Sequence, residues 1–112
     1  MPLKLDNYDG VGVFSIKGDL VTDEVAGLRD SIEDMIERKD VVDFVFDMNG
    51  CEFIDSAGLE ALAWLQGRCD ELFGRLKLVS PDPNVTKILE MTRLAPRFDI
   101  SHELNTAIKS LR

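Results

Sequence analysis

The sequence has few of the residues from which metal sites and disulfide frameworks are built. It contains one histidine, His102, and two cysteines, Cys51 and Cys69, which form no CxxC pair. Structural zinc sites are usually recognisable from short spacings between Cys and His ligands, and no such spacing is present. Cys69 falls on a predicted buried helix stripe, where a free thiol behaves as a small hydrophobe. We therefore expect no disulfide, no metal site and no bound cofactor.

Long apolar runs and excess positive charge are also missing. No stretch approaches the roughly 18 apolar residues of a membrane-spanning helix, and the first residues lack a signal-peptide segment. The 13 Lys and Arg residues are outnumbered by 21 Asp and Glu residues, which gives a formal net charge of −8. Such a charge disfavours contact with phosphate backbones and with anionic membrane surfaces. We expect a cytoplasmic protein with no nucleic-acid partner and no direct membrane contact.

Motifs of common enzyme classes are absent as well. The chain contains neither of the glycine-rich phosphate loops, GxGxxG and GxxxxGK[ST], nor the GxSxG pattern of serine hydrolases. A hydrolase would have to use His102 as its base, and nothing in the sequence brings His102 to Ser56 or to a cysteine. We therefore expect a protein that is not an enzyme.

The chain does contain the hydrophobic patterning of one α/β domain over residues 1–112. Of its residues, 45% are hydrophobic and 30% are charged, which suits a single core. Periodicity predicts strands at residues 3–5, 11–16, 41–47, 76–79 and 98–100, in the order β-β-α-β-α-β-α-β-α. Strands joined through helices need crossover connections. We therefore predict a small mixed, mostly parallel sheet that begins with an antiparallel hairpin and packs its helices on one face.

Polar side chains and prolines predict where several helices begin. Thr22 or Asp23 should cap the first helix and Ser101 the last, because short polar side chains accept hydrogen bonds from unpaired N–H groups. The two prolines of loop 80–84 should keep the third helix from starting before residue 84.

The first and second helices should present distinct faces. On the first, Arg29 and Glu33 are four residues apart and should form an ion pair. The second should bury an apolar stripe that includes Phe73 and should end at Gly74. Trp64 lies at the margin of that stripe, where it is either border core or an anchor for a partner.

The start of the second helix is the strongest candidate for a functional site. A helix N-terminus presents unpaired N–H groups and a partial positive charge, and here it directly follows the predicted central strand. Either Ser56 caps this helix, or Asp55 caps it and leaves the Ser56 hydroxyl free. Gly58 in the first turn lowers helix stability by roughly 0.5–1 kcal/mol relative to Ala, which suggests close approach by another backbone or by a partner.

Residues 53–59, Phe-Ile-Asp-Ser-Ala-Gly-Leu, follow the strand that ends at Asp47 and resemble the signature of the STAS domain, the family of bacterial anti-sigma factor antagonists. The likeness extends from residues 17–20 through residues 91–94 to the last helix. The resemblance implies a small mixed sheet with helices. It also implies that Ser56 is phosphorylated by an anti-sigma factor that is itself a serine kinase. The free form would occupy that kinase and release a sigma factor, and a separate serine phosphatase would remove the phosphate.

The resemblance also implies a partner-binding surface around the phosphoacceptor. Its predicted members are Asp55, Ala57, Gly58, Leu59, Glu60, Asp19 and Asp23. The family commonly has an aspartate where this chain has Val21, so Asp19 and Asp23 are the expected replacements. Glu60 favours a basic partner, and Ala57 replaces a second hydroxyl. The alternative is a STAS accessory subunit of a membrane lipid-transport ATPase, with Ser56 only a cap. We expect a monomer or a weak dimer.

Overall fold

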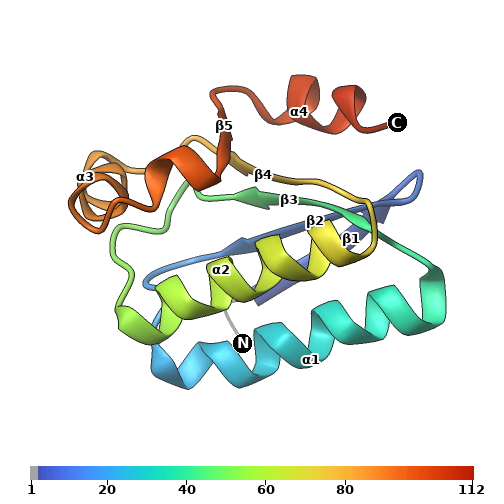
Figure 1. The fold of residues 1–112 in the computed structure, drawn as a ribbon, viewed down its shortest axis with the longest axis horizontal. Coiled ribbons are helices and arrows are strands. Elements are labelled where there is room, and N and C mark those ends of the chain that lie inside the picture. The colour runs from blue at the N-terminus through green and yellow to red at the C-terminus, as the bar shows by residue number, and fades with distance from the viewer. Residues whose placement is uncertain (1–2) are drawn as a thin grey trace.

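Alternation of side chains along the strands builds one mixed sheet in the computed structural model, which describes residues 3–112 (Figure 1). The strands lie side by side in chain order: β1 (Leu3–Tyr8), β2 (Val11–Ile16), β3 (Asp43–Asp47), β4 (Leu76–Val79) and β5 (Asp99–Ser101). β1 is antiparallel to β2, and all other neighbours are parallel. The predicted α/β fold, with a mostly parallel sheet that begins with a hairpin, is confirmed.

Helices cover both faces of this sheet. They are α1 (Thr22–Lys39), α2 (Ser56–Glu71), α3 (Pro83–Met91) and α4 (Leu104–Ser110), with a short 3-10 turn at Ala95–Arg97. The first three pack on one face, and α4 crosses the other (Figure 1). The prediction that the helices share one face is therefore wrong for α4. Strands β2 to β4 also point valines toward the second face, and α4 covers them with Ala107 and Ile108.

The main core lies between the sheet and α1, α2 and α3. Phe14 and Phe46 are paired across β2 and β3, and their stacked rings lie with centroids 4.5 Å apart. Cys51 and Cys69 are both buried and free, and the predicted burial of Cys69 on α2 is confirmed. Burial raises the pKa of the Cys69 thiol to about 12, so this group stays protonated at neutral pH and packs as an apolar side chain.

Two helices begin elsewhere than predicted. α3 starts at Pro83, one residue earlier than the expected limit, because the fixed φ and missing N–H of proline suit the first helical position. Asp82 caps that helix by accepting a hydrogen bond from a backbone N–H. Glu103, rather than Ser101, caps α4. Ser101 is instead the last residue of β5, so it lies outside the turn that leads into the helix.

The end of α2 also differs from the prediction. The helix ends at Glu71, and Phe73 has a left-handed backbone (φ 59°) with its side chain 98% exposed. The prediction that Phe73 lies on the buried stripe is wrong, because the helix has ended before it. Gly74 is needed for space: a Cβ there would lie 1.8 Å from the carbonyl oxygen of Val42.

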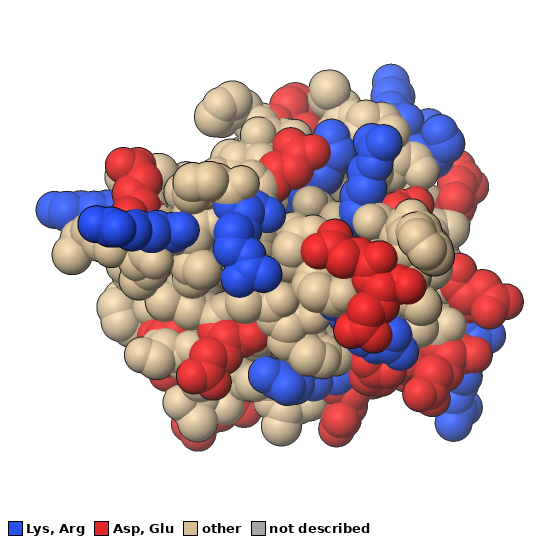
Figure 2. All heavy atoms as spheres, viewed as in Figure 1, with Lys and Arg blue, Asp and Glu red and all other residues tan. Residues whose placement is uncertain are grey.

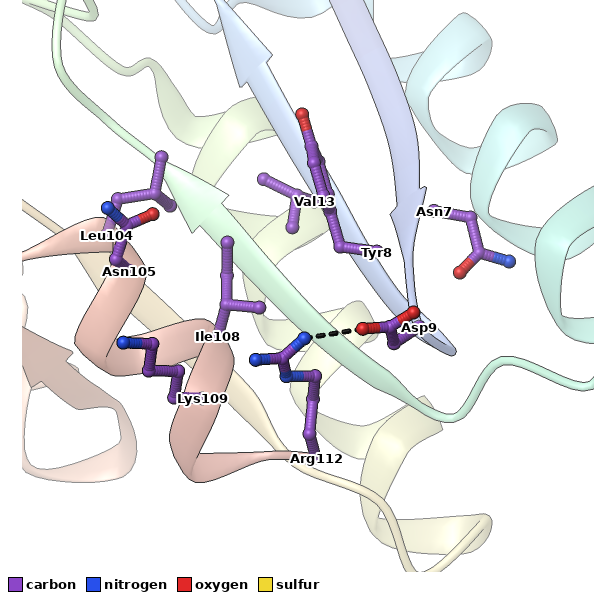
Figure 3. A pocket seen from close by; sticks show the side chains of 9 residues that line it. All are labelled: Asn7, Tyr8, Asp9, Val13, Leu104, Asn105, Ile108, Lys109 and Arg112. Atoms are coloured by element: carbon purple, nitrogen blue, oxygen red, sulfur yellow. Dashed lines mark hydrogen bonds and ion pairs between the residues drawn. The ribbon is translucent and has the colours of Figure 1, made fainter.

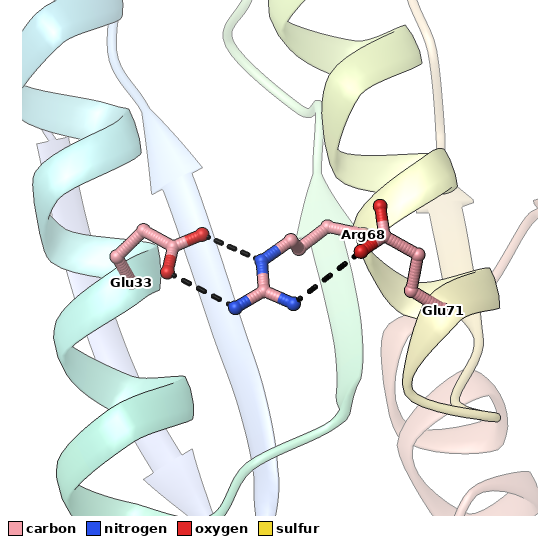
Figure 4. Close-up of polar contacts among 3 residues, drawn as sticks. All are labelled: Glu33, Arg68 and Glu71. Atoms are coloured by element: carbon pink, nitrogen blue, oxygen red, sulfur yellow. Dashed lines mark hydrogen bonds and ion pairs between the residues drawn. The ribbon is translucent and has the colours of Figure 1, made fainter.

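Charged side chains join α1 to α2 (Figure 4). Glu33 accepts hydrogen bonds from Arg68, at 2.8 Å from Nε and 3.2 Å from Nη2, and Glu71 adds an ion pair at 3.9 Å. The hydrogen bond from Arg68 lowers the pKa of Glu33. The predicted pairing of Arg29 with Glu33 is wrong, since Arg29 lies over the Trp64 ring, 5.0 Å from its centroid. Trp64 is half-buried against the core, which confirms the border position.

Charge is unevenly spread over the surface formed by α1 and α2. Figure 2 shows acidic and basic side chains interspersed over this face, with a larger acidic group toward the end where the two helices finish and a smaller one toward the end where they begin. This end is the carboxyl edge of the parallel strands, where sites in α/β sheets usually gather. Within residues 3–112, none of the helices has the length and apolar character that crossing a bilayer requires.

Candidate functional site

Asp55 caps α2, which decides between the two capping alternatives. Its backbone is extended, and its Oδ1 accepts a hydrogen bond from the N–H of Gly58 at 2.8 Å. That hydrogen bond, helped by others from Thr22, lowers the pKa of the Asp55 carboxyl. A charged carboxylate at neutral pH therefore holds the first turn of the helix.

The same carboxylate joins the starts of α1 and α2. Its Oδ2 accepts hydrogen bonds from the backbone N–H and the hydroxyl of Thr22, both at 3.0 Å. α1 begins after Val21, and no side chain of the neighbouring residues caps it. The predicted capping by Thr22 or Asp23 is therefore wrong, because a carboxylate 33 residues away takes that place.

Backbone hydrogen bonds hold the same two segments together. The N–H of Leu20 donates to the carbonyl of Phe53 at 3.0 Å, and the N–H of Asp55 donates to the carbonyl of Leu20 at 3.2 Å. Leu20 and Ile54 form an isolated parallel bridge, and both side chains are buried. The segment before α1 is thus fixed directly beside the start of α2.

Ser56 is the first helical residue of α2, and its side chain is exposed. Its Oγ forms no hydrogen bond with any other residue of 3–112, because the cap is supplied by Asp55. The hydroxyl therefore lies open to solvent at a helix N-terminus, where unpaired N–H groups and the helix dipole favour a negative group. The geometry is compatible with attachment of an anion to this oxygen.

Gly58 lies beneath this surface. It is buried, and a Cβ at this position would lie 2.4 Å from the carbonyl oxygen of Leu20 and 2.7 Å from Cγ1 of Ile54. Of the two predicted reasons for a glycine here, the structure shows the approach of another backbone. Gly58 sets the distance between α2 and the segment that precedes α1.

The other predicted residues lie in the first turn of α2 and in the segment that is hydrogen-bonded to Asp55, and they differ in burial. Ala57 and Leu59 are half-buried in the first turn of α2, and Glu60 is exposed. Asp19 and Asp23 are exposed on the neighbouring segment, on either side of the residues that contact Asp55. The surface thus combines small and apolar side chains with an acidic border.

Phe53 belongs to the same surface, and the sequence reasoning missed it. Its side chain is 47% exposed, next to the buried Ile54. The signal was available, because neighbouring residues of an extended segment point to opposite sides, and Ile54 is the one that a core would bury. Exposed aromatic side chains are enriched in protein interfaces, so Phe53 is a candidate partner contact.

We expect the Asp55→Asn variant to be less stable than the wild type at neutral pH and nearly equal to it in acid. An Asn amide can still accept from Gly58, but its NH₂ group would face the N–H of Thr22. The folded-state pKa of Asp55 is lowered. The contribution of the carboxylate to stability is therefore complete above its unfolded pKa of about 3.9. That contribution is lost as the pH falls through the folded value.

Thermal unfolding at pH 7 and pH 3 checks this expectation. The difference in Tm between wild type and Asp55→Asn should shrink as the pH falls. Asp30→Asn, on the exposed face of α1, is the matched control and should leave Tm unchanged at either pH. A constant difference between wild type and Asp55→Asn across this range would contradict a role for the charged carboxylate.

Comparisons with known proteins identify the family and support the fold. The family profile of the STAS domain matches residues 3–107. No curated protein sequence matches the chain. Three solved structures illustrate the structural likeness. TM1081 from Thermotoga maritima is 20% identical, with a TM-score of 0.89 over 98% of this chain and 94% of that one.

The second structure is SpoIIAA, a Bacillus cell fate determinant and anti-sigma factor antagonist, in its unphosphorylated form. It is 22% identical, with a TM-score of 0.88 over 98% of this chain and 96% of that one. The third, an anti-sigma factor antagonist from Mycobacterium paratuberculosis, is 24% identical, with a TM-score of 0.82 over 98% and 92%. At such identities the structures establish the fold, and the profile establishes the family. This chain belongs to the STAS domain family.

Proposed function

We propose that this protein is an anti-sigma factor antagonist whose docking is switched by phosphorylation of Ser56. The unmodified form binds and occupies an anti-sigma factor that is a serine kinase. That kinase transfers a phosphoryl group from ATP to the Ser56 hydroxyl, and a serine phosphatase removes it. The antagonist itself catalyses no step and acts in the cytoplasm. Support comes from the family and from SpoIIAA, which has been solved in phosphorylated and unphosphorylated forms.

Asp55 and Ser56 have different roles at the start of α2, and this difference is the main support for the proposal. Asp55 holds the first turn of α2, and the exposed Ser56 hydroxyl takes part in none of the hydrogen bonds that fix that turn. A group added to Ser56 therefore displaces no contact on which the helix depends. The fold can be the same in both forms while the surface presented to a partner changes.

Elementary electrostatics explains how one phosphate could act as a switch. A phosphoserine carries roughly −1.5 to −2 charges at neutral pH. On the free protein these charges face water and the favourable end of the α2 dipole. In a complex the same group would be buried, and burying a charge without a prepared cation costs several kcal/mol. Phosphorylation thus weakens the complex and leaves the stability of the free protein nearly unchanged.

The border of the site indicates the chemistry of the partner. Asp19, Asp23, Glu52 and Glu60 are exposed around the start of α2. A partner surface with basic residues at its rim complements this border, and an apolar patch complements the exposed Phe53.

The alternative, an accessory subunit of a lipid-transport ATPase, is not favoured. In that interpretation Ser56 would serve only as a cap, and Asp55 is the residue that caps α2. The neighbours named above by function are anti-sigma factor antagonists.

We expect Ser56→Ala to fold normally and to resist phosphorylation. Because the hydroxyl holds no contact, the free energy of unfolding should change by less than about 0.5 kcal/mol. Incubation with the serine kinases encoded in the source genome and ATP should add the mass of one phosphate to the wild type and none to the variant. A decrease of about 1 kcal/mol or more in the free energy of unfolding is the usual effect of removing a cap, and it would identify Ser56 as a cap.

A further inference from the structure

A groove lies on the opposite face of the sheet, at the opposite edge from Ser56. It is formed between the turn that joins β1 to β2 and helix α4, and its volume is about 360 Å³ (Figure 3). The turn lies at the amino edge of the parallel strands, whereas α2 begins at the carboxyl edge. The groove is therefore separate from the proposed docking surface.

The inside of the groove is apolar. Val13 of β2 forms the floor, and Leu104 and Ile108 of α4 form one wall. Tyr8 forms the other wall, and its side chain is 48% exposed (Figure 3). Small-molecule sites usually have volumes of about 300–1,000 Å³ and combine such walls with a few polar groups. The groove thus has room for one aromatic ring or a short acyl chain.

The rim of the groove carries positive charge on a protein of net charge −8. Arg112 forms an ion pair with Asp9 across one end (Figure 3). Lys109 is exposed and has no ion-pair partner within the described chain. Glu103, at the other end of α4, has both carboxylate oxygens engaged by backbone N–H groups of the first turn. The ammonium group of Lys109 therefore has no ion-pair partner in the described chain. Figure 3 shows its side chain directed along α4 toward Asn105, so the ammonium lies at the rim of the groove and not over its floor.

We propose that this groove binds a small amphipathic carboxylate. The apolar body of the ligand lies on Val13 and Ile108 against the ring of Tyr8, and its carboxylate accepts a hydrogen bond from Lys109. One free cation beside an apolar floor matches one anionic group on one apolar body. The side-chain amide of Asn105, also at the rim, supplies a further donor. This inference does not depend on the phosphorylation of Ser56.

Binding can be tested by NMR with two probes of nearly equal shape, 4-phenylbutyrate and the neutral 4-phenyl-1-butanol. Titration of the ¹⁵N-labelled full chain with 4-phenylbutyrate should give saturable shifts, with dissociation constants in the millimolar range or below. The shifts should concentrate at the amides of Tyr8, Val13, Asn105 and Ile108. The neutral probe should bind at least about fivefold more weakly, because it lacks the group that Lys109 recognises.

Variants distinguish specific binding in the groove from nonspecific binding of the probes to other surfaces. Lys109→Gln should weaken 4-phenylbutyrate binding about tenfold and leave 4-phenyl-1-butanol binding unchanged. Lys87→Gln, at an exposed lysine of α3, should change neither. The spectrum of each variant reports whether it is folded. Shifts spread over other surfaces, equal affinity for the two probes, or unchanged affinity in Lys109→Gln would each overturn the proposal. Ser56→Ala should bind 4-phenylbutyrate like the wild type, so failure of the proposed phosphoswitch leaves this test valid.

Discussion

Phosphorylation of Ser56 is expected to lower the affinity of the protein for its docking partner by a few hundredfold. Without a matching cation, burial of the phosphate should cost about 3–4 kcal/mol, and each 1.4 kcal/mol is a factor of ten in the dissociation constant. The partner can be captured from native cells with Ser56→Ala, which should bind permanently. Calorimetric titration of that partner with the phosphorylated and unphosphorylated protein then gives the two constants.

A glutamate at position 56 tests the effect of a negative charge on partner binding without the need for a kinase. Ser56→Glu adds one negative charge and less bulk than a phosphate. We therefore expect its affinity for the partner to fall by about tenfold or more. Ser110→Glu makes the same chemical change at an exposed position of α4, on the other face of the sheet, and should leave the affinity unchanged. If Ser56→Glu binds within threefold of the wild type, the charge at this position does not control docking.

Gly58→Ala is expected to produce the second large effect, a loss of about 2 kcal/mol or more in the free energy of unfolding. The new Cβ would lie 2.4 Å from the carbonyl oxygen of Leu20, which is backbone and cannot rotate away. Relief requires α2 to move from the segment before α1, and this also disturbs the hydrogen bonds between Asp55 and Thr22. Partner binding should weaken together with stability, as measured by urea unfolding and by titration.

The same helix supplies the control for this prediction. Gly67→Ala also replaces a glycine of α2, but nothing lies within 4 Å of the position that its Cβ would take. Alanine favours the helix over glycine by about 0.8–1 kcal/mol, so Gly67→Ala should raise stability by up to this amount. The two variants should therefore change stability in opposite directions. Equal effects would show that packing against Leu20 is not what requires Gly58.

Local patterns predicted most of the fold because burial repeats along a strand or helix at a short, fixed period. Phe44 and Phe46 alternate with Val45 on β3, and this alternation alone places two side chains on one face and one on the other. The motif of residues 53–59 likewise indicated a helix start, although it left open whether Ser56 or Asp55 caps that helix. Such predictions depend only on neighbours within a few residues.

Two predictions failed because a distant residue competed for the same group. Arg29 was expected to pair with Glu33 on its own helix, but Arg68 from α2 occupies Glu33 with two hydrogen bonds. Thr22 was expected to cap its own helix, but its N–H and hydroxyl are engaged by Asp55. In both cases the local partner was chemically suitable, and the packing of α2 beside α1 supplied a better-placed one.

The sequence by itself determined the order of strands and helices, the acidic character and the candidate hydroxyl at the start of α2, because each follows from composition or from short-range periodicity. Only the tertiary structure decided that Asp55 also binds Thr22 at the start of α1, that Gly58 faces the Leu20 backbone, and that α4 covers the second face beside a groove. These features require segments far apart in the chain to meet. Which segments meet depends on how all the apolar faces are buried together, and no local pattern contains that information.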